Sequence, residues 1–246
     1  LSHRTGVWTN CHALPPHLAT WPLLLRLCGY ETVISGRNHL LWGDRMAGFA
    51  RRLCGDEVSA IPYIPPDSTL LGRRGPQGLD TQLGSCAHTV HADHDITASR
   101  EAVRYLEAQD GTQPFALFVG LYQPHAPFVA LPEFFAPAGQ EPPPAPADEP
   151  LHDLYAPLHR RLQLDRGIEP RRLNLAVQAY YAMVAHVDAL LGQVLDTLDA
   201  RGLRDNTIVL FTSDHGEMLG RHRLWHKMTF YEDSVRVPMI FSNPAR

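Results

Sequence analysis

The 246-residue sequence lacks several features that would place it in a specialised class of protein. No apolar run approaches the ~20 residues needed to span a bilayer, so the sequence gives no reason to expect a membrane segment. Its four cysteines form no Cys-x-x-Cys pair, which argues against a structural zinc site and leaves open whether they are free or bridged. A net charge of −4 gives no reason to expect nucleic acid or an acidic membrane surface as a partner.

What the sequence does contain is an alternation of helix and strand patterns. Helices are expected over residues 17–27, 97–109 and 174–200, and strands over residues 32–35, 115–121, 207–211 and 237–241. The strand at 115–121 is apolar without alternation, which is typical of a sheet covered on both faces. The sequence therefore predicts an α/β fold with a largely parallel sheet flanked by helices on both faces.

The longest expected helix, residues 174–200, carries an apolar stripe at helical spacing that Asp188 interrupts. The other members of the stripe are Val177, Tyr181, Val184, Leu191, Leu195 and Leu198. Because buried polar groups are normally paired, we expect Asp188 to be a buried, satisfied carboxylate rather than a functional one.

A proline-rich stretch lies within residues 136–172 and includes Glu141-Pro142-Pro143-Pro144-Ala145-Pro146. Its composition cannot build a hydrophobic core by itself. We interpret residues 136–172 as a surface loop inserted over a functional site, within a single domain that covers residues 1–246.

The stretch Thr212-Ser213-Asp214-His215-Gly216-Glu217-Met218-Leu219-Gly220 directly follows an expected strand. In an open α/β sheet, ligands bind beyond the carboxyl ends of the strands. The Asp214 carboxylate and the His215 imidazole suit a divalent metal, and Lys227 suits an anion held against that metal. The alternative is a plain turn, since Ser, Asp and Gly favour turns.

Two further groups of residues follow expected strands. His125 lies between Pro124 and Pro127, which fix the backbone around it, so its ring can serve an oxyanion as a donor or proton source. Arg37 and His39 are two residues apart and share a face. The alternatives are an ordinary surface histidine in a proline turn and a solvated surface arginine.

Taken in order, these segments resemble the sulfatase family of the alkaline-phosphatase superfamily, and most of all its choline-sulfatase and phosphonate-monoester-hydrolase branch. The resemblance covers most of the chain except about residues 55–95 and 136–167. The matching segments are Arg4-Thr5-Gly6-Val7, Gly29-Tyr30-Glu31-Thr32 with Gly36-Arg37-Asn38-His39, Gln123-Pro124-His125-Ala126-Pro127-Phe128, and Thr212 to Gly220 with Trp225-His226-Lys227-Met228-Thr229-Phe230-Tyr231-Glu232.

The resemblance implies an alkaline-phosphatase-like sulfatase core and a role for each of these residues. Asp214 and His215 would be metal ligands, while Lys227 and His125 would hold the sulfate and one of them would protonate the leaving oxygen. His39 would help to release sulfate from the nucleophile. Arg37 replaces the family's Lys, and because Arg does not give up its proton, it would stabilise charge only. The implied metal is Ca²⁺, with Mn²⁺ or Mg²⁺ as alternatives; the imidazole ligand favours Mn²⁺ among them.

The family's nucleophile is a formylglycine made from the Cys of a C-x-[PA]-x-R motif. None of the four cysteines, Cys11, Cys28, Cys54 and Cys86, stands in that motif, and the resemblance places the nucleophile before Leu1. The chain also begins without Met and stops after an expected strand, so we expect a fragment of a longer enzyme, incomplete at both ends of the core and inactive alone.

The resulting hypothesis is hydrolysis of a small-molecule sulfate ester. The alternatives are a phosphonate or phosphate ester hydrolase of the same superfamily, and a non-catalytic anion-binding protein derived from the fold. The sequence predicts neither the alcohol part of the substrate nor the oligomeric state.

Overall fold

The computed structural model describes residues 2–8, 12–15, 17–38, 46–56, 83–135, 150–161 and 169–243. The chain divides into two compact units, which are treated separately below. Unit 1 is drawn from Leu1–Pro65, Val90–Tyr122 and Val187–Leu203, and unit 2 from Pro66–Thr89, Gln123–His186 and Arg204–Arg246.

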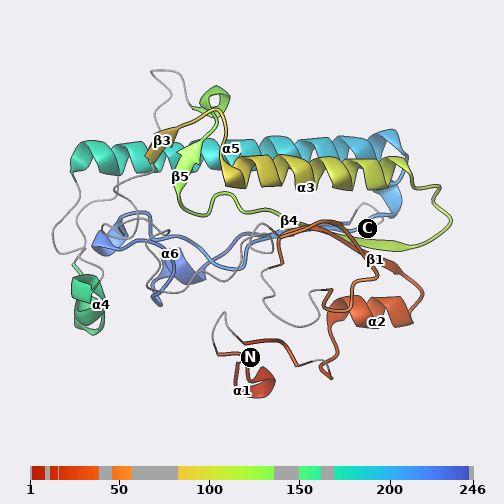
Figure 1. The fold of residues 1–246 in the computed structure, drawn as a ribbon, viewed down its shortest axis with the longest axis horizontal. Coiled ribbons are helices and arrows are strands. Elements are labelled where there is room, and N and C mark those ends of the chain that lie inside the picture. The colour runs from red at the N-terminus through yellow and green to blue at the C-terminus, as the bar shows by residue number, and fades with distance from the viewer. Residues whose placement is uncertain are drawn as a thin grey trace. The chain divides into compact units, whose positions relative to one another are not determined.

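Unit 1 is built on a three-stranded parallel sheet. Its strands lie in the order β2 (Arg51–Cys54), β1 (Glu31–Gly36) and β4 (Phe115–Gly120). Figure 1 shows α3 (Val90–Glu107) above this sheet and α2 (Trp21–Leu27) below it. The central strand β1 is almost entirely buried, which agrees with its apolar Val-Ile pair and with cover on both faces.

The helices of unit 1 begin and end for recognisable reasons. Pro22 occupies the first turn of α2, where its missing N–H costs nothing, and Gly29 follows the helix with a φ of 89°. The first helix, α1 (Ser2–Thr5), is a single turn. Helix α3 begins at Val90, earlier than the expected residue 97, and the Ser99 hydroxyl inside it donates to the carbonyl of Leu190 at 3.2 Å.

Unit 2 has its core between the first part of α5 (Pro170–Ala200) and the parallel strand pair β3 (Leu83–Ser85) and β5 (Phe128–Ala130). Small residues of α5 let the larger side chains pack closely against the helix. The buried members are Phe128, Ala130, Ala176, Ala179, Ala182, Met183, Met218, Leu224 and Trp225. A second pair, β6 (Val209–Thr212) and β7 (Met239–Ser242), is antiparallel.

The buried face of α5 differs from the expected stripe. Tyr181 and Val184 are 46% and 43% exposed, and Asp188 is exposed as well, so the expectation of a buried Asp188 was wrong. The buried polar residue of this helix is His186, at 3% exposure. The buried face of α5 is instead formed largely by alanines, Ala176, Ala179 and Ala182. Their small side chains let the helix pack closely against Phe128 and Ala130 of β5.

By length and composition alone, α5 is long and apolar enough to cross a membrane, although it contains no uninterrupted apolar run of that length. The core helix of a soluble protein passes the same test, so this is weak support for a span. In unit 2, its buried residues pack against protein side chains.

The remaining elements of unit 2 are short. They are η4 (Pro132–Phe134), η5 (Asp153–Tyr155), α4 (Ala156–Arg161), η7 (Arg204–Asn206), η8 (Arg221–Arg223) and α6 (Glu232–Val235). Within the expected loop at residues 136–172, the structure therefore places η5, α4 and the start of α5, and these parts are helical. Residues 136–149 and 162–168 lie outside the described residues.

Candidate active site

Asp214 and His215 follow strand β6 directly, as the sequence predicts. The Asp214 side chain is 81% exposed, and its Oδ2 lies 3.6 Å from Nε2 of His215. Nδ1 of His215 lies 2.8 Å from the Gly216 carbonyl, which accepts a hydrogen bond if Nδ1 carries the proton. That tautomer leaves the Nε2 lone pair on the side of the carboxylate, the arrangement common for a metal-binding histidine.

These two atoms fit a shared divalent ion. Metal–nitrogen and metal–oxygen bonds are roughly 2.0–2.5 Å long, so two atoms 3.6 Å apart can contact the same ion. Asp214 and His215 supply only two ligands, however. In the part of the chain that the structure describes, no group of three or more His, Cys, Asp or Glu side chains is gathered to hold a metal. The metal assignment of these residues stays a prediction.

Gly216 allows the loop that carries Asp214 and His215 to pack closely against α6. A Cβ at Gly216 would lie 2.0 Å from the carbonyl oxygen of Asp233, in the first turn of α6. The Gly216 N–H also donates to the Ser234 carbonyl at 2.8 Å. The loop that carries Asp214 and His215 is therefore held against α6, and only glycine permits this approach.

Glu217 is a partly buried carboxylate, with its side chain 11% exposed, to which the sequence assigned no role. One of its oxygens, Oε1, accepts from the backbone N–H groups of Leu219 and His226, so it bridges the two ends of the loop before Lys227. Burial raises the pKa of Glu217, and those two N–H donors and Lys227 oppose the rise. The sequence carries no signal for this role, because the role depends on which backbone N–H groups the carboxylate meets in the fold.

Lys227 and His125 come together although they are 102 residues apart in the chain. Nζ of Lys227 lies 3.3 Å from Nε2 of His125. Nδ1 of His125 lies 2.6 Å from the Ala126 carbonyl, which accepts a hydrogen bond if Nδ1 is protonated. In that tautomer, Nε2 accepts from the Lys227 ammonium, and the pair shares a proton between two basic groups.

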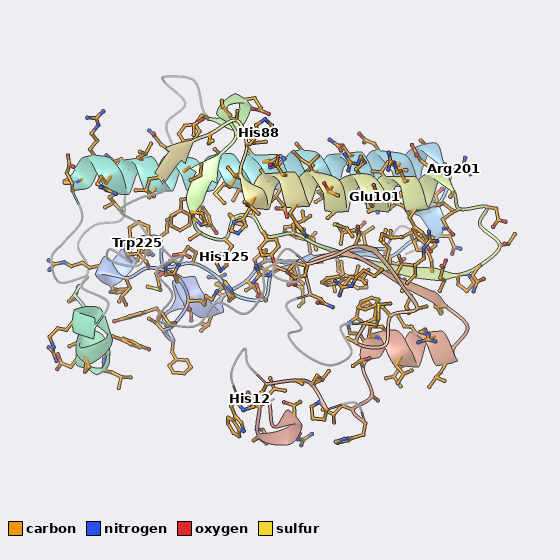
Figure 2. All side chains as sticks on the ribbon, viewed as in Figure 1. His12, His88, Glu101, His125, Arg201 and Trp225 are labelled. Atoms are coloured by element: carbon orange, nitrogen blue, oxygen red, sulfur yellow. The ribbon has the colours of Figure 1, made fainter. Side chains whose placement is uncertain are left out.

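The loop that carries His125 is anchored on α5. The Gln123–Pro124 and Ala126–Pro127 peptide bonds are both cis. Oε1 of Gln123 lies 2.6 Å from Nδ1 of the buried His186. Figure 2 shows His125 and Trp225 on the same side of α5, beneath its ribbon.

Arg37 lies in unit 1, directly after β1. Its backbone N–H donates to the Gly120 carbonyl at 2.9 Å, and its guanidinium carbon lies 4.1 Å from the centre of the Tyr122 ring. His39 lies outside the described residues. The roles that the resemblance implies for Arg37 and His39 stay predictions.

Comparison with known proteins identifies the class to which this fold and these residues belong. The family model described as Sulfatase matches residues 1–246, and the chain belongs to this family. The expected family and the expected α/β fold are thus confirmed.

Two curated relatives and one solved structure are similar to this chain over nearly all of its length. The choline-sulfatase of Rhizobium meliloti (strain 1021) is 30% identical over 263 residues, covering 100% of this chain and 51% of that protein. Arylsulfatase K of Gallus gallus is 28% identical over 266 residues, covering 99% and 47%. The crystal structure of the phosphonate monoester hydrolase of Agrobacterium radiobacter shares the fold, with a TM-score of 0.68 and 23% identity over 99% of this chain and 56% of its own. The chain spans about half the length of the curated relatives it matches.

Proposed function

We propose that the protein containing this chain hydrolyses sulfate esters of small molecules, and that Lys227 and His125 hold the sulfate group. The observation that carries the proposal is the 3.3 Å contact between Lys227 Nζ and His125 Nε2. This contact places two nitrogen atoms that can donate to the same anion side by side: the Lys227 ammonium, and His125 Nε2 when the ring is doubly protonated. Membership of the sulfatase family supports the sulfate ester as that anion.

The chemistry needs positive groups where negative charge grows. During displacement at sulfur, charge accumulates on the non-bridging oxygens and on the departing oxygen of the alcohol. Fixed donors stabilise such charge most when they are already in place before the reaction. The Ser234 hydroxyl donates to the Lys227 carbonyl at 2.7 Å, which holds the backbone, and the ammonium itself contacts His125 Nε2 at 3.3 Å.

The shared proton gives the Lys227–His125 pair a second task. As the alcohol leaves, its oxygen must gain a proton. His125 can deliver one from Nε2 when the ring is doubly protonated, and Lys227 can replace that proton across 3.3 Å. Which of the two protonates the leaving oxygen is part of the proposal and is separated by the variants below.

Asp214 and His215 would hold the divalent metal, for which Ca²⁺ is our first choice and Mn²⁺ or Mg²⁺ the alternatives. When bound, such an ion draws charge from the ester oxygen and lowers the pKa of a nucleophile. The nucleophile that the family uses, a formylglycine, would lie outside this chain.

Paired kinetics test this function. The full-length protein encoded by the gene is assayed with 4-nitrophenyl sulfate and with 4-nitrophenyl phenylphosphonate. We expect the larger kcat/KM for the sulfate ester, and a loss of roughly a hundredfold in Lys227→Ala. Arg171→Ala removes the same charge at an exposed position in unit 2 and serves as the control.

Each other outcome points to a specific alternative. A larger kcat/KM for the phosphonate would replace sulfate esters by phosphonate esters as the substrate class. Sulfate binding without turnover of either ester would indicate a non-catalytic anion-binding protein.

A further inference from the structure

The backbone of unit 2 is held on both sides of the Lys227 Cα. The His226 carbonyl, in the peptide group before Lys227, accepts from the Met218 N–H at 2.9 Å. The Lys227 carbonyl, in the peptide group after it, accepts from the Ser234 hydroxyl at 2.7 Å. Because both flanking peptide groups are bound, these contacts set the direction in which the Lys227 side chain leaves the backbone.

The Glu217 carboxylate completes this arrangement by binding two backbone N–H groups with a single oxygen. Its Oε1 accepts from the N–H of His226 at 2.5 Å and from the N–H of Leu219 at 3.1 Å. His226 therefore has both its N–H and its carbonyl bound to two consecutive residues, Glu217 and Met218. The Glu217 side chain is only 11% exposed, and hydrogen bonds that are shielded from water are electrostatically stronger.

The two residues whose N–H groups Glu217 accepts are both in a conformation that side chains rarely adopt. The φ angle is 43° at Leu219 and 67° at His226. Each such residue costs about 1–3 kcal/mol and keeps its conformation only where the surroundings determine it. A hydrogen bond to a charged acceptor contributes about 1.5–3 kcal/mol, so the two bonds to Oε1 are large enough to offset this cost.

We propose that Glu217 is a positioning residue, whose Oε1 holds the His226 peptide in the conformation that brings the Lys227 ammonium to His125 Nε2. This inference rests on the proposed function, because it gives Lys227 the sulfate group as its ligand. The alternative is a direct effect of charge. Burial raises the pKa of Glu217, and the Lys227 ammonium is among the groups that oppose that rise, so the two charges interact.

Two substitutions separate position from charge. Glu217→Gln removes the charge but keeps an oxygen in the place of Oε1, so both N–H groups stay bound. Glu217→Asp keeps the charge, but its side chain is one methylene shorter and its oxygen does not reach both N–H groups. A positioning role therefore requires the Gln variant to behave like the parent and the Asp variant to lose sulfate affinity.

The test uses inorganic sulfate and the full-length protein. An amine-reactive reagent modifies Lys227, peptide mapping follows the rate, and chloride keeps the ionic strength constant. The measured quantity is the sulfate concentration that halves this rate. We expect it to stay within about twofold of the parent in Glu217→Gln and to rise roughly fivefold in Glu217→Asp, the effect of about 1 kcal/mol.

Asp110 provides a matched control in unit 1, in the turn between α3 and β4. Its Oδ1 also accepts two hydrogen bonds, from the Thr112 N–H at 2.9 Å and from the Thr112 hydroxyl at 2.7 Å. Asp110→Ala removes both bonds and should leave the half-protecting sulfate concentration unchanged. Circular dichroism confirms that each variant is folded at the temperature used.

A double-mutant cycle on kcat/KM for 4-nitrophenyl sulfate separates positioning from general packing. In a Lys227→Ala background, Glu217→Asp should cause no further loss, because the group that Glu217 positions is absent. The same loss with and without Lys227 would overturn the inference. Metal analysis accompanies the kinetics, and loss of metal in Glu217→Asp would also overturn it, since Glu217 would then act on Asp214 and His215.

The remaining outcomes distinguish this inference from the proposed function. Sulfate protection that persists in Glu217→Asp and disappears in Glu217→Gln would show an effect of charge and reject positioning. Equal changes in Glu217→Asp and Asp110→Ala, or a parent in which sulfate does not protect Lys227, would reject it as well. A parent that shows the expected protection pattern but hydrolyses no sulfate ester would leave the inference standing and reject the proposed function.

Discussion

The sharpest prediction separates the role of Lys227 from that of His215 in the full-length protein. Lys227 should act on the substrate anion and His215 on the metal. Lys227→Ala should lower kcat/KM while the metal content stays near that of the parent. His215→Ala should lower both, and high metal concentration should recover part of the activity, because mass action offsets a weakened site.

The expected size of the Lys227 effect follows from its surroundings. A unit charge about 3 Å from a sulfate oxygen contributes about 5 kcal/mol at an effective dielectric constant of about 20. The Lys227 side chain is only half-buried, so solvent screens part of this. Removal of one transition-state donor usually costs about 2.7–4 kcal/mol, and the lower end, about a hundredfold in rate, suits a half-buried ammonium. Lys227→Arg, which keeps the charge, should retain more activity than Lys227→Ala.

The assay combines steady-state kinetics on 4-nitrophenyl sulfate with metal analysis of each purified variant by mass spectrometry. Lys227 is the only lysine in the chain, so an amine-reactive reagent followed by peptide mapping reports on this side chain directly. Sulfate should slow its modification. Loss of metal in Lys227→Ala, or full metal occupancy in His215→Ala, would refute the division of roles.

Three further predictions concern the chain itself. The 246-residue chain alone should not hydrolyse an aryl sulfate, since none of its cysteines stands in the nucleophile motif; metal-dependent turnover that Asp214→Ala abolishes would contradict this. Gly216→Ala should lower the free energy of unfolding by at least about 2 kcal/mol because its Cβ would meet a carbonyl oxygen at 2.0 Å, whereas Gly192→Ala, in open space on α5, should raise it by about 0.5–1 kcal/mol, as urea unfolding would show. Although burial opposes it, the contacts of His94 with Asp95 and with the carbonyl of Gly55 raise its pKa, so its stabilising charge is present below about pH 6.5 and is lost as pH rises through the raised pKa. Urea midpoints from pH 5.5 to 8.5 should therefore fall less steeply in His94→Gln, and identical slopes would contradict the assignment.

The strands could be predicted from the sequence because their signals are local. The apolar runs at 32–35 and 115–121 became β1 and β4 with small shifts of their ends. The antiparallel partnership of β6 and β7 could not be read in the same way. Strand order depends on contacts between distant residues, and an apolar run does not state its partner.

The helices show where local signals fail. The start of α3 was placed at Thr97, yet Thr97 lies inside the helix with its hydroxyl donating to the Asp93 carbonyl at 2.9 Å. A cap residue and a mid-helix residue of the same type differ only in their hydrogen-bond partner, which the sequence does not show. The same limit applies to α5, where the apolar stripe predicted a buried Asp188 and packing instead buries His186 against Gln123.

The candidate site divides along the same line. Asp214, His215, His125 and Lys227 could be selected because each follows a strand or lies in a family motif. Glu217 and Tyr122 could not be selected, because the sequence does not show which groups their side chains contact in the fold. Glu217 binds the backbone of a loop, and Tyr122 binds a guanidinium from another strand.

The loop before Lys227 has a strained backbone that its contacts hold in place. Leu219, His222, Arg223 and His226 all have positive φ values, between 43° and 67°, which side chains rarely adopt and which cost of order 1 kcal/mol each. Such a backbone persists only where the surroundings determine it. Here Glu217 accepts the N–H groups of Leu219 and His226, while Met218, Leu224 and Trp225 anchor the loop in the core of unit 2. The same loop leads into Lys227, whose Nζ lies 3.3 Å from Nε2 of His125. Because strained backbone is concentrated at functional sites, the strain before Lys227 supports the proposal that this residue binds the sulfate group.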